Sequence, residues 1–81
     1  MNPRVTSVVA REDYTLEITF STGEVGLFDC ASLLDFGVFQ ELRDVRYFKQ
    51  AHVVGGTVAW PHEQDICPDT LYEESKKLAS K

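Results

Sequence analysis

The chain has 81 residues, of which 43% are hydrophobic and 11% aromatic, and its formal net charge at pH 7 is −5. A chain this short forms one domain at most, so we expect a single domain over residues 1–81. The hydrophobic share argues against intrinsic disorder. The acidic charge argues against nucleic-acid binding, which needs a basic face, and it suits a basic protein partner. No apolar run is long enough for a membrane span or a signal peptide, so we expect a cytoplasmic protein.

The first third of the chain carries the pattern of an antiparallel meander. Residues 14–20 alternate between apolar and polar side chains without a break, which predicts a half-buried strand. The β-branched run at 4–10 and the segment 25–29 predict a strand on either side of it. Gly23 is free to adopt a positive φ, so the second and third strands are expected to form a hairpin.

The spacing of the apolar residues then becomes helical. Short helical segments are predicted at residues 30–34, 38–42 and 45–49, with Asp29 and Asp44 as the caps of the first and the third. Each segment is too short to bury its apolar side chains alone. They are therefore expected to cover one face of the sheet.

A second hairpin and a final helix complete the predicted elements. Residues 51–54 and 57–60 predict two strands joined by the tight turn Gly55-Gly56. Pro68 suits the first position of a helix, because it has no N–H to leave unpaired there. The charges that follow complement the helix dipole, with Asp69, Glu73 and Glu74 first and Lys76, Lys77 and Lys81 last. The inward stripe of this helix is expected to consist of Leu71, Ser75, Leu78 and Ala79.

These elements predict an α+β fold with a mainly antiparallel sheet of about five strands. Short helices and a C-terminal helix are expected to pack on one face of that sheet. The predicted core gathers the apolar side chains at the inward positions of these elements: Val8, Leu16, Ile18, Phe20, Leu27, Leu34, Val38, Phe39, Leu42, Phe48, Val53, Val58, Trp60, Ile66, Leu71 and Leu78.

An ordered set of short motifs gives the chain a family resemblance. They are Phe20-x-x-Gly23-Glu24, Asp29 with the Leu33-Leu34 pair, Gly37-Val38-Phe39, Leu42-Arg43-Asp44 with Phe48, Trp60-Pro61, Asp65-Ile66, Pro68-Asp69 and Leu71-Tyr72. In this combination the chain resembles the small bacterial family catalogued as domain of unknown function 2442, from about Val5 to Tyr72.

The resemblance implies a compact α+β domain with a mainly antiparallel sheet. Some family members carry an added helix-turn-helix domain and look like DNA-binding regulators, but this chain is too short for one. Stand-alone members often lie beside a gene for another small protein, which suggests toxin–antitoxin pairs and a protein-binding role. The family has no agreed catalytic residues to transfer. Its members usually have glycine or asparagine in a polar turn after Trp-Pro, where this chain has His62-Glu63-Gln64.

The segment from Trp60 to Tyr72 concentrates the residues that are capable of chemistry. His62, Asp65 and Cys67, with His52, are the material for a zinc site, but their spacing matches no known zinc-site pattern. The structural alternative makes His62 an exposed turn residue, Asp65 a cap for the final helix and Cys67 the small residue before it. We favour that alternative and expect neither a metal nor another cofactor.

The two cysteines and the single tryptophan also have structural roles to fill. Cys30 and Cys67 are too few and too far apart for a disulfide framework, so free thiols are expected. A nucleophilic thiol needs a base and an oxyanion site, and the sequence shows no arrangement of that kind. Trp60 is expected in the core, with exposure as a recognition residue as the alternative.

The leading functional hypothesis is therefore a non-enzymatic protein-binding or regulatory module, the antitoxin-like partner of a small basic protein. The alternative is a small ligand-binding or enzymatic domain with a cleft near Trp60, His62, Asp65 and Cys67. A homodimer joined through an exposed strand edge is a third hypothesis. The candidate functional or interaction residues are Trp60, His62, Asp65, Cys67, Asp69 and Tyr72.

Overall fold

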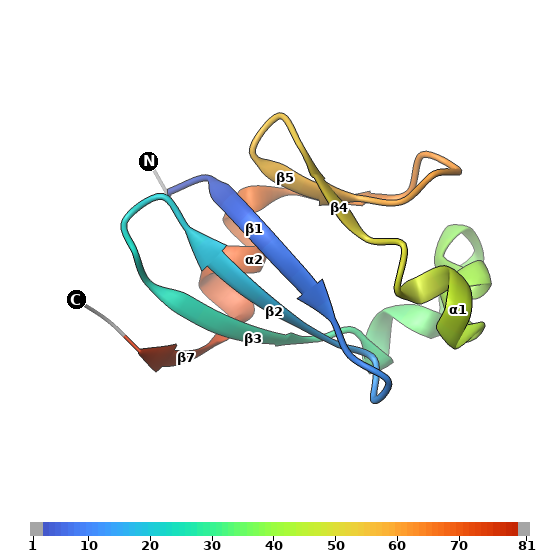
Figure 1. Ribbon diagram of the computed structural model, residues 1–81. Helices are drawn as coiled ribbons and strands as arrows, with labels where there is room; N and C mark the ends of the chain where they lie inside the picture. The colour runs from blue at the N-terminus through green and yellow to red at the C-terminus, as the bar shows by residue number, and fades with distance from the viewer. Residues whose placement is uncertain (1–2, 80–81) are drawn as a thin grey trace.

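Two antiparallel sheets divide the strands of the protein between them, as the computed structural model in Figure 1 shows. The structure describes residues 3–79, apart from the side chains of residues 38 and 77–79. The four-stranded sheet has the order β1-β2-β3-β7, with the bounds β1 (Val5–Ala10), β2 (Thr15–Phe20), β3 (Val25–Asp29) and β7 (Lys76–Ala79). The three-stranded sheet has the order β4-β5-β6, with the bounds β4 (His52–Val54), β5 (Thr57–Ala59) and β6 (Asp65–Ile66).

Four short helical elements connect the sheets. The bounds are η1 (Ala31–Asp35) and η2 (Gly37–Arg43), both 3-10 helices, then α1 (Val45–Phe48) and α2 (Pro68–Glu74). The predicted cap at Asp44 is confirmed, because Asp44 Oδ1 accepts from the backbone N–H of Arg46 at 3.0 Å. The predicted cap at Asp29 is wrong by one position. The cap of η1 is Cys30, although Asp29 Oδ1 accepts from the backbone N–H of Ala31 at 2.9 Å.

The prediction of a mixed, mainly antiparallel fold is confirmed, but the single sheet of about five strands is wrong. The β4–β5 hairpin does not extend the first sheet in register. It lies along β1 instead, where the backbone N–H of Val5 donates to Gly56 O at 2.8 Å. β6 and β7 were missed, because a strand of two residues and a strand rich in lysine carry little periodic signal.

The predicted C-terminal helix ends earlier than the sequence suggested. α2 stops at Glu74, and Ser75 adopts extended dihedral angles. The chain then enters β7, where Lys76 pairs with Leu27 of β3. The backbone N–H and C=O groups of this segment therefore find their partners in the sheet and not in a helix. The predicted inward side chains of Leu78 and Ala79 lie outside the described side chains, and Lys81 lies outside the described residues.

Ser75 packs directly over Gly26 of β3. A Cβ atom at Gly26 would lie 2.5 Å from the hydroxyl oxygen and 3.0 Å from the Cβ atom of Ser75, so a side chain there would force Ser75 to move. The contact also buries the Ser75 hydroxyl without a hydrogen-bond partner among the described residues.

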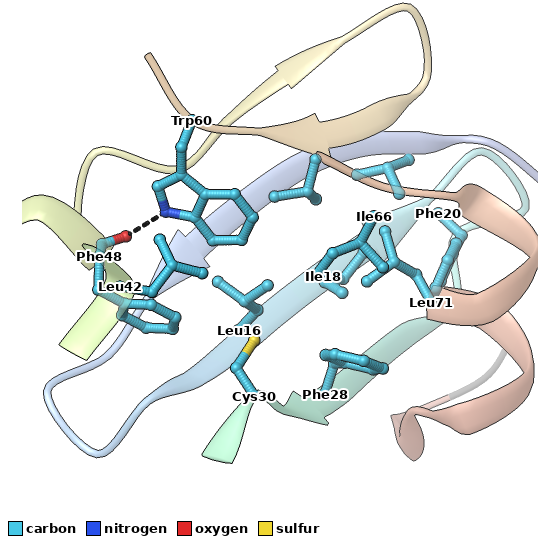
Figure 2. Packing of buried hydrophobic residues seen from close by; sticks show 12 residues of the cluster. Leu16, Ile18, Phe20, Phe28, Cys30, Leu42, Phe48, Trp60, Ile66 and Leu71 are labelled. Atoms are coloured by element: carbon cyan, nitrogen blue, oxygen red, sulfur yellow. Dashed lines mark hydrogen bonds between the residues drawn. The ribbon is translucent and has the colours of Figure 1, made fainter. Parts of the chain in front are cut away.

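The core lies between the inner face of the first sheet, α2, the helical segment and the β5–β6 hairpin (Figure 2). Among the described side chains, the buried hydrophobic ones are Val5, Leu16, Ile18, Phe20, Phe28, Cys30, Leu42, Phe48, Val58, Trp60, Ile66 and Leu71. The prediction is confirmed for the nine that it named, including Trp60. Val8, Leu34, Phe39 and Val53 are only partly buried against the cluster. The side chains of Val38 and Leu78 are outside the described set.

One core assignment was displaced by a single position. Leu27 was predicted to face inward, but Phe28 is buried and Leu27 is only half-buried. The register explains the difference, because Phe28 pairs with Leu16 and Leu27 pairs with Glu17. Paired residues of an antiparallel ladder point to the same face, so Phe28 joins Leu16 in the core.

Tyr14 attaches the helical segment to the first sheet. It has a φ of 67°, the left-handed conformation, which costs a residue with a side chain about 1–2 kcal/mol. Its ring meets the ring of Phe48 edge-on at 5.4 Å, and its hydroxyl donates to Arg43 O. These contacts hold the segment of η2 and α1 beside the sheet, which sets the position of the site described next.

Candidate functional site

The turn between β5 and β6 approaches the helical segment, as the orange loop above α1 in Figure 1 shows. Two backbone bonds close it: Trp60 N–H donates to Gln64 O at 2.9 Å, and Glu63 N–H donates to Trp60 O at 3.0 Å. Glu63 has a φ of 75°, in the left-handed region that favours glycine and asparagine. The turn therefore holds a residue with a long side chain in a conformation that glycine adopts at lower cost.

A closed ring of hydrogen bonds ties this turn to η2 and α1. His62 Nδ1 lies 2.7 Å from Glu41 Oε2, and Gln64 Nε2 donates to Glu41 Oε1 at 2.8 Å. The Tyr47 hydroxyl donates to Gln64 Oε1 at 2.7 Å and accepts from the backbone N–H of His62 at 2.9 Å. The rings of Tyr47 and His62 lie 5.2 Å apart. Gln64 is only 7% exposed, and the ring supplies a partner to both its amide oxygen and its amide nitrogen.

The hydrogen-bonded ring also favours the ionised form of the Glu41 carboxylate. The bond from His62, and after it the bond from Gln64, hold the pKa of Glu41 below its usual value. Because a carboxylate only accepts, Nδ1 of His62 carries the proton in this contact. The pair is half-exposed, so it contributes little stability alone and acts as one member of the ring.

A hollow of about 490 Å³ opens beside this ring. It is lined by Phe39, Glu41, His62, Glu63, Gln64 and Asp65. Glu41 is engaged by the ring, whereas the carboxylates of Glu63 and Asp65 make no hydrogen bond or ion pair with the part of the chain that the structure describes. The hollow thus combines one aromatic wall with two carboxylates that are free to bind.

The comparisons with known proteins agree with the motifs in the chain. A model of the family described as protein of unknown function (DUF2442) matches residues 5–77. The chain belongs to the DUF2442 family. No curated protein and no solved structure matches the chain significantly.

The backbone of Glu63 bears on the turn that the resemblance implies. The resemblance implies glycine or asparagine in the turn after Trp60-Pro61, and in this chain Glu63 of that turn has the left-handed conformation. Glycine and asparagine adopt this conformation most readily. Glu63 therefore pays a backbone penalty at a position where it lines the hollow.

The six candidate residues named from the sequence lie in three places. Trp60 is 2% exposed, and its indole N–H donates to Phe48 O at 2.9 Å in the core (Figure 2). His62 and Asp65 line the hollow. Cys67 and Asp69 are exposed at the start of α2, and Tyr72 is half-buried on the same helix, with its ring against Phe20 and its hydroxyl donating to Glu24 at 2.9 Å. The structure therefore does not gather the six into one site.

The predicted role of Asp65 as a helix cap is wrong. The cap position of α2 is Cys67, and no side chain accepts a hydrogen bond there. Asp65 lies in β6, paired with Ala59 of β5, and its exposed side chain faces the hollow instead. Pro68 accounts for the start of the helix, because it removes one N–H that would otherwise need a partner.

The two cysteines are free and have different surroundings. Cys30 is buried in the core, where burial, and after it the charge of Asp29, raises the pKa of its thiol to about 12. A thiol with such a pKa stays protonated and is a poor nucleophile. Cys67 is exposed and does not line the hollow.

The metal hypothesis gains no support from the positions of its residues. His52 is exposed on β4, where its Nδ1 lies 3.0 Å from Gln50 O. Within residues 3–79, no group of three or more His, Cys, Asp or Glu side chains is arranged to hold a metal ion. In the same described range, no helix is both long and apolar enough to cross a membrane.

Sequence reasoning missed three members of the site: Phe39, which was assigned to the core alone, and Glu41 and Tyr47. Glu41 and Tyr47 lie 15 to 23 residues away in sequence from the turn residues that they contact. No local pattern links positions so far apart. The signal that could have pointed to the site was the turn His62-Glu63-Gln64, which departs from the turn that the family resemblance implies.

Proposed function

We propose that the chain is a non-enzymatic protein-binding module, and that it acts as the regulatory, antitoxin-like partner of a small basic protein. The observation that carries this proposal is the hollow beside the β5–β6 turn, where Glu63 and Asp65 present unengaged carboxylates. Two such charges in one concave surface attract a cationic group and orient it. The net charge of −5 adds long-range attraction for a basic partner.

The site is held ready for a partner before any binding. The hydrogen-bonded ring fixes the turn against η2 and α1, and the core anchors the turn through the indole N–H of Trp60. A surface that is already ordered loses little conformational entropy when a partner docks. This rigidity supports a recognition role for the turn.

The ligand-binding or enzymatic alternative needs four residues around one cleft. His62 and Asp65 line the hollow, whereas Trp60 is buried in the core and Cys67 does not line it. Half of the proposed constellation is therefore outside the hollow. The geometry gives more support to a binding surface than to a reaction centre.

Affinity capture from the source cell tests the proposal. The tagged chain, the double variant Glu63→Gln/Asp65→Asn and the control Glu74→Gln are each used as bait, and captured proteins are identified by mass spectrometry. Glu74 is an exposed carboxylate of α2 that does not line the hollow, so the control removes a charge elsewhere. We expect a small basic protein with the parent chain and with the control, but not with the double variant.

Two results would contradict the proposal. One is the capture of no specific basic protein by the parent chain. The other is equal capture by the double variant, which would separate binding from the hollow. A homodimer through a strand edge stays a second prediction, and sedimentation velocity at high concentration tests it: a monomer alone would reject it.

A further inference from the structure

We infer that the hollow binds the side chain of an arginine presented by the protein partner. This inference rests on the proposed function and specifies the chemical group that the site recognises. It depends on three properties of the hollow: which of its polar groups are free, what forms its apolar wall, and how rigidly both are held.

The unengaged acidic groups of the hollow are two carboxylates. Gln64 Nε2 donates to Glu41 Oε1, and His62 Nδ1 lies 2.7 Å from Glu41 Oε2, so the third carboxylate that lines the hollow is already engaged. The carboxylates of Glu63 and Asp65 remain available. A complementary group should therefore be positively charged and rich in hydrogen-bond donors.

Phe39 distinguishes between the two cationic side chains. It lines the hollow and is partly buried against the core cluster, so it contributes an apolar aromatic surface there. A guanidinium is flat, weakly hydrated and able to stack on an aromatic face while it donates to carboxylates at its edge. The ammonium of lysine is compact and strongly hydrated, so it gains less from such a wall. The combination of ring and carboxylates favours arginine.

The two carboxylates have fixed backbone positions. Glu63 is held in its left-handed conformation by the bond from its N–H to Trp60 O, and Asp65 is held by its pairing with Ala59. Since the backbone of both residues is already ordered, binding of a planar guanidinium between their carboxylates costs little conformational entropy. A flexible acidic tail of the same charge would lack this advantage.

The test is a titration of the isotope-labelled full chain followed by ¹H–¹⁵N NMR. The ligands are blocked tripeptides that contain arginine, lysine or citrulline, the last being a neutral analogue with the shape of arginine. We expect the arginine peptide to shift the amides of residues 39, 63 and 65, the lysine peptide to bind more weakly, and the citrulline peptide to cause no shift.

Three variants place the binding on the named groups. Glu63→Gln/Asp65→Asn should weaken binding of the arginine peptide about tenfold or more, because two charge-assisted bonds are lost. Phe39→Leu keeps an apolar wall without the aromatic face, so it should reduce the preference for arginine over lysine. Glu74→Gln should behave like the parent chain. The dispersion of each spectrum shows directly whether the variant is folded.

The outcomes separate the inference from the function on which it rests. Equal binding of the arginine and citrulline peptides, shifts outside the hollow, or no preference over lysine would overturn the inference. If a basic protein is still captured through Glu63 and Asp65 under those circumstances, the binding function stands and only the arginine assignment fails. If no basic protein is captured at all, the function itself fails.

Discussion

The inner face of the first sheet and the β5–β6 turn are held in place by different forces. On the sheet, Leu16, Ile18 and Phe20 alternate with polar residues and are almost completely buried. At the turn, the contacts are hydrogen bonds between side chains, and the hollow beside them stays open. The sheet gains its stability from burial of apolar surface, whereas the turn gains its shape from polar groups that satisfy one another.

This difference indicates that the sheet core supports the fold, whereas the β5–β6 turn is available for function. Burial is non-directional and large, so the sheet core tolerates no loss of volume. A hydrogen-bonded ring is directional and modest in net free energy, so it positions groups without dominating stability. We therefore expect substitutions in the core to unfold the chain and substitutions in the ring to alter the turn while the fold persists.

The largest effect is expected from Trp60→Ala. The change removes a side chain that is 2% exposed, together with the indole bond to Phe48 O at 2.9 Å, which leaves that oxygen with only the backbone N–H of Ala51. We expect the free energy of unfolding to fall by about 3–5 kcal/mol, measured by urea denaturation followed by far-ultraviolet circular dichroism. Val54→Ala is the control, because Val54 is 51% exposed and should be nearly neutral. A similar loss for both would show that Trp60 is not a core anchor.

The next effect is expected from Tyr47→Phe, which breaks the ring and keeps the aromatic packing. It removes the donor to Gln64 and the acceptor for the His62 N–H. We expect a loss of about 1–2 kcal/mol, because partly buried groups are left without partners. Hydrogen exchange distinguishes the regions: the amide of His62 should exchange faster, while that of Ile18 should follow global unfolding alone. Parallel acceleration at both amides would mean that ring and sheet open together.

The same difference explains what could be predicted from the sequence. Periodicity is a local property, so the alternation at residues 15–20 identified β2 and its buried face. The identity of Phe28 as the buried residue of β3 required the pairing register, which short strands do not reveal. The ring required knowledge that Glu41 reaches His62 and Gln64, a tertiary fact. The end of α2 at Glu74 depended on the pairing of β7 with β3, which the helical charge pattern could not reveal.

A smaller effect, of opposite sign, is expected from Glu63→Gly. Glycine relieves about 1–2 kcal/mol of left-handed strain but adds freedom to the unfolded chain, so the net gain should be roughly 0.5–1 kcal/mol. Urea denaturation measures it. Glu74→Gly is the control. Among the described residues other than glycine, only Tyr14 and Glu63 have a positive φ, so Glu74 has no left-handed strain to relieve. Glycine at this position should therefore slightly destabilise α2. Destabilisation by Glu63→Gly would mean that its side chain contributes more than the strain costs.

The smallest effect is the pH dependence that Glu41 contributes. Bonds from His62 and Gln64 hold its pKa in the folded chain below the ordinary value of 4.5. Stability from a carboxylate with a lowered pKa is fully present above the unfolded value and is lost as the pH falls through the folded value. The difference in unfolding free energy between the parent chain and Glu41→Gln should therefore shrink as the pH falls below 4.5. Denaturation series at several pH values measure it.

His62 is the partner that decides how this series must be interpreted. Its Nδ1 makes the bond that contributes most to the lowered pKa of Glu41. Glu63, Asp65 and the Tyr47 hydroxyl are the other titratable groups beside it. In the His62→Ala background, the bond that contributes most to the lowered pKa is absent, so the pH dependence should weaken. Glu74→Gln should leave it unchanged. If the pH dependence is undiminished without His62, the bond from Gln64 is the one that lowers the pKa of Glu41, and the contribution assigned to His62 is wrong.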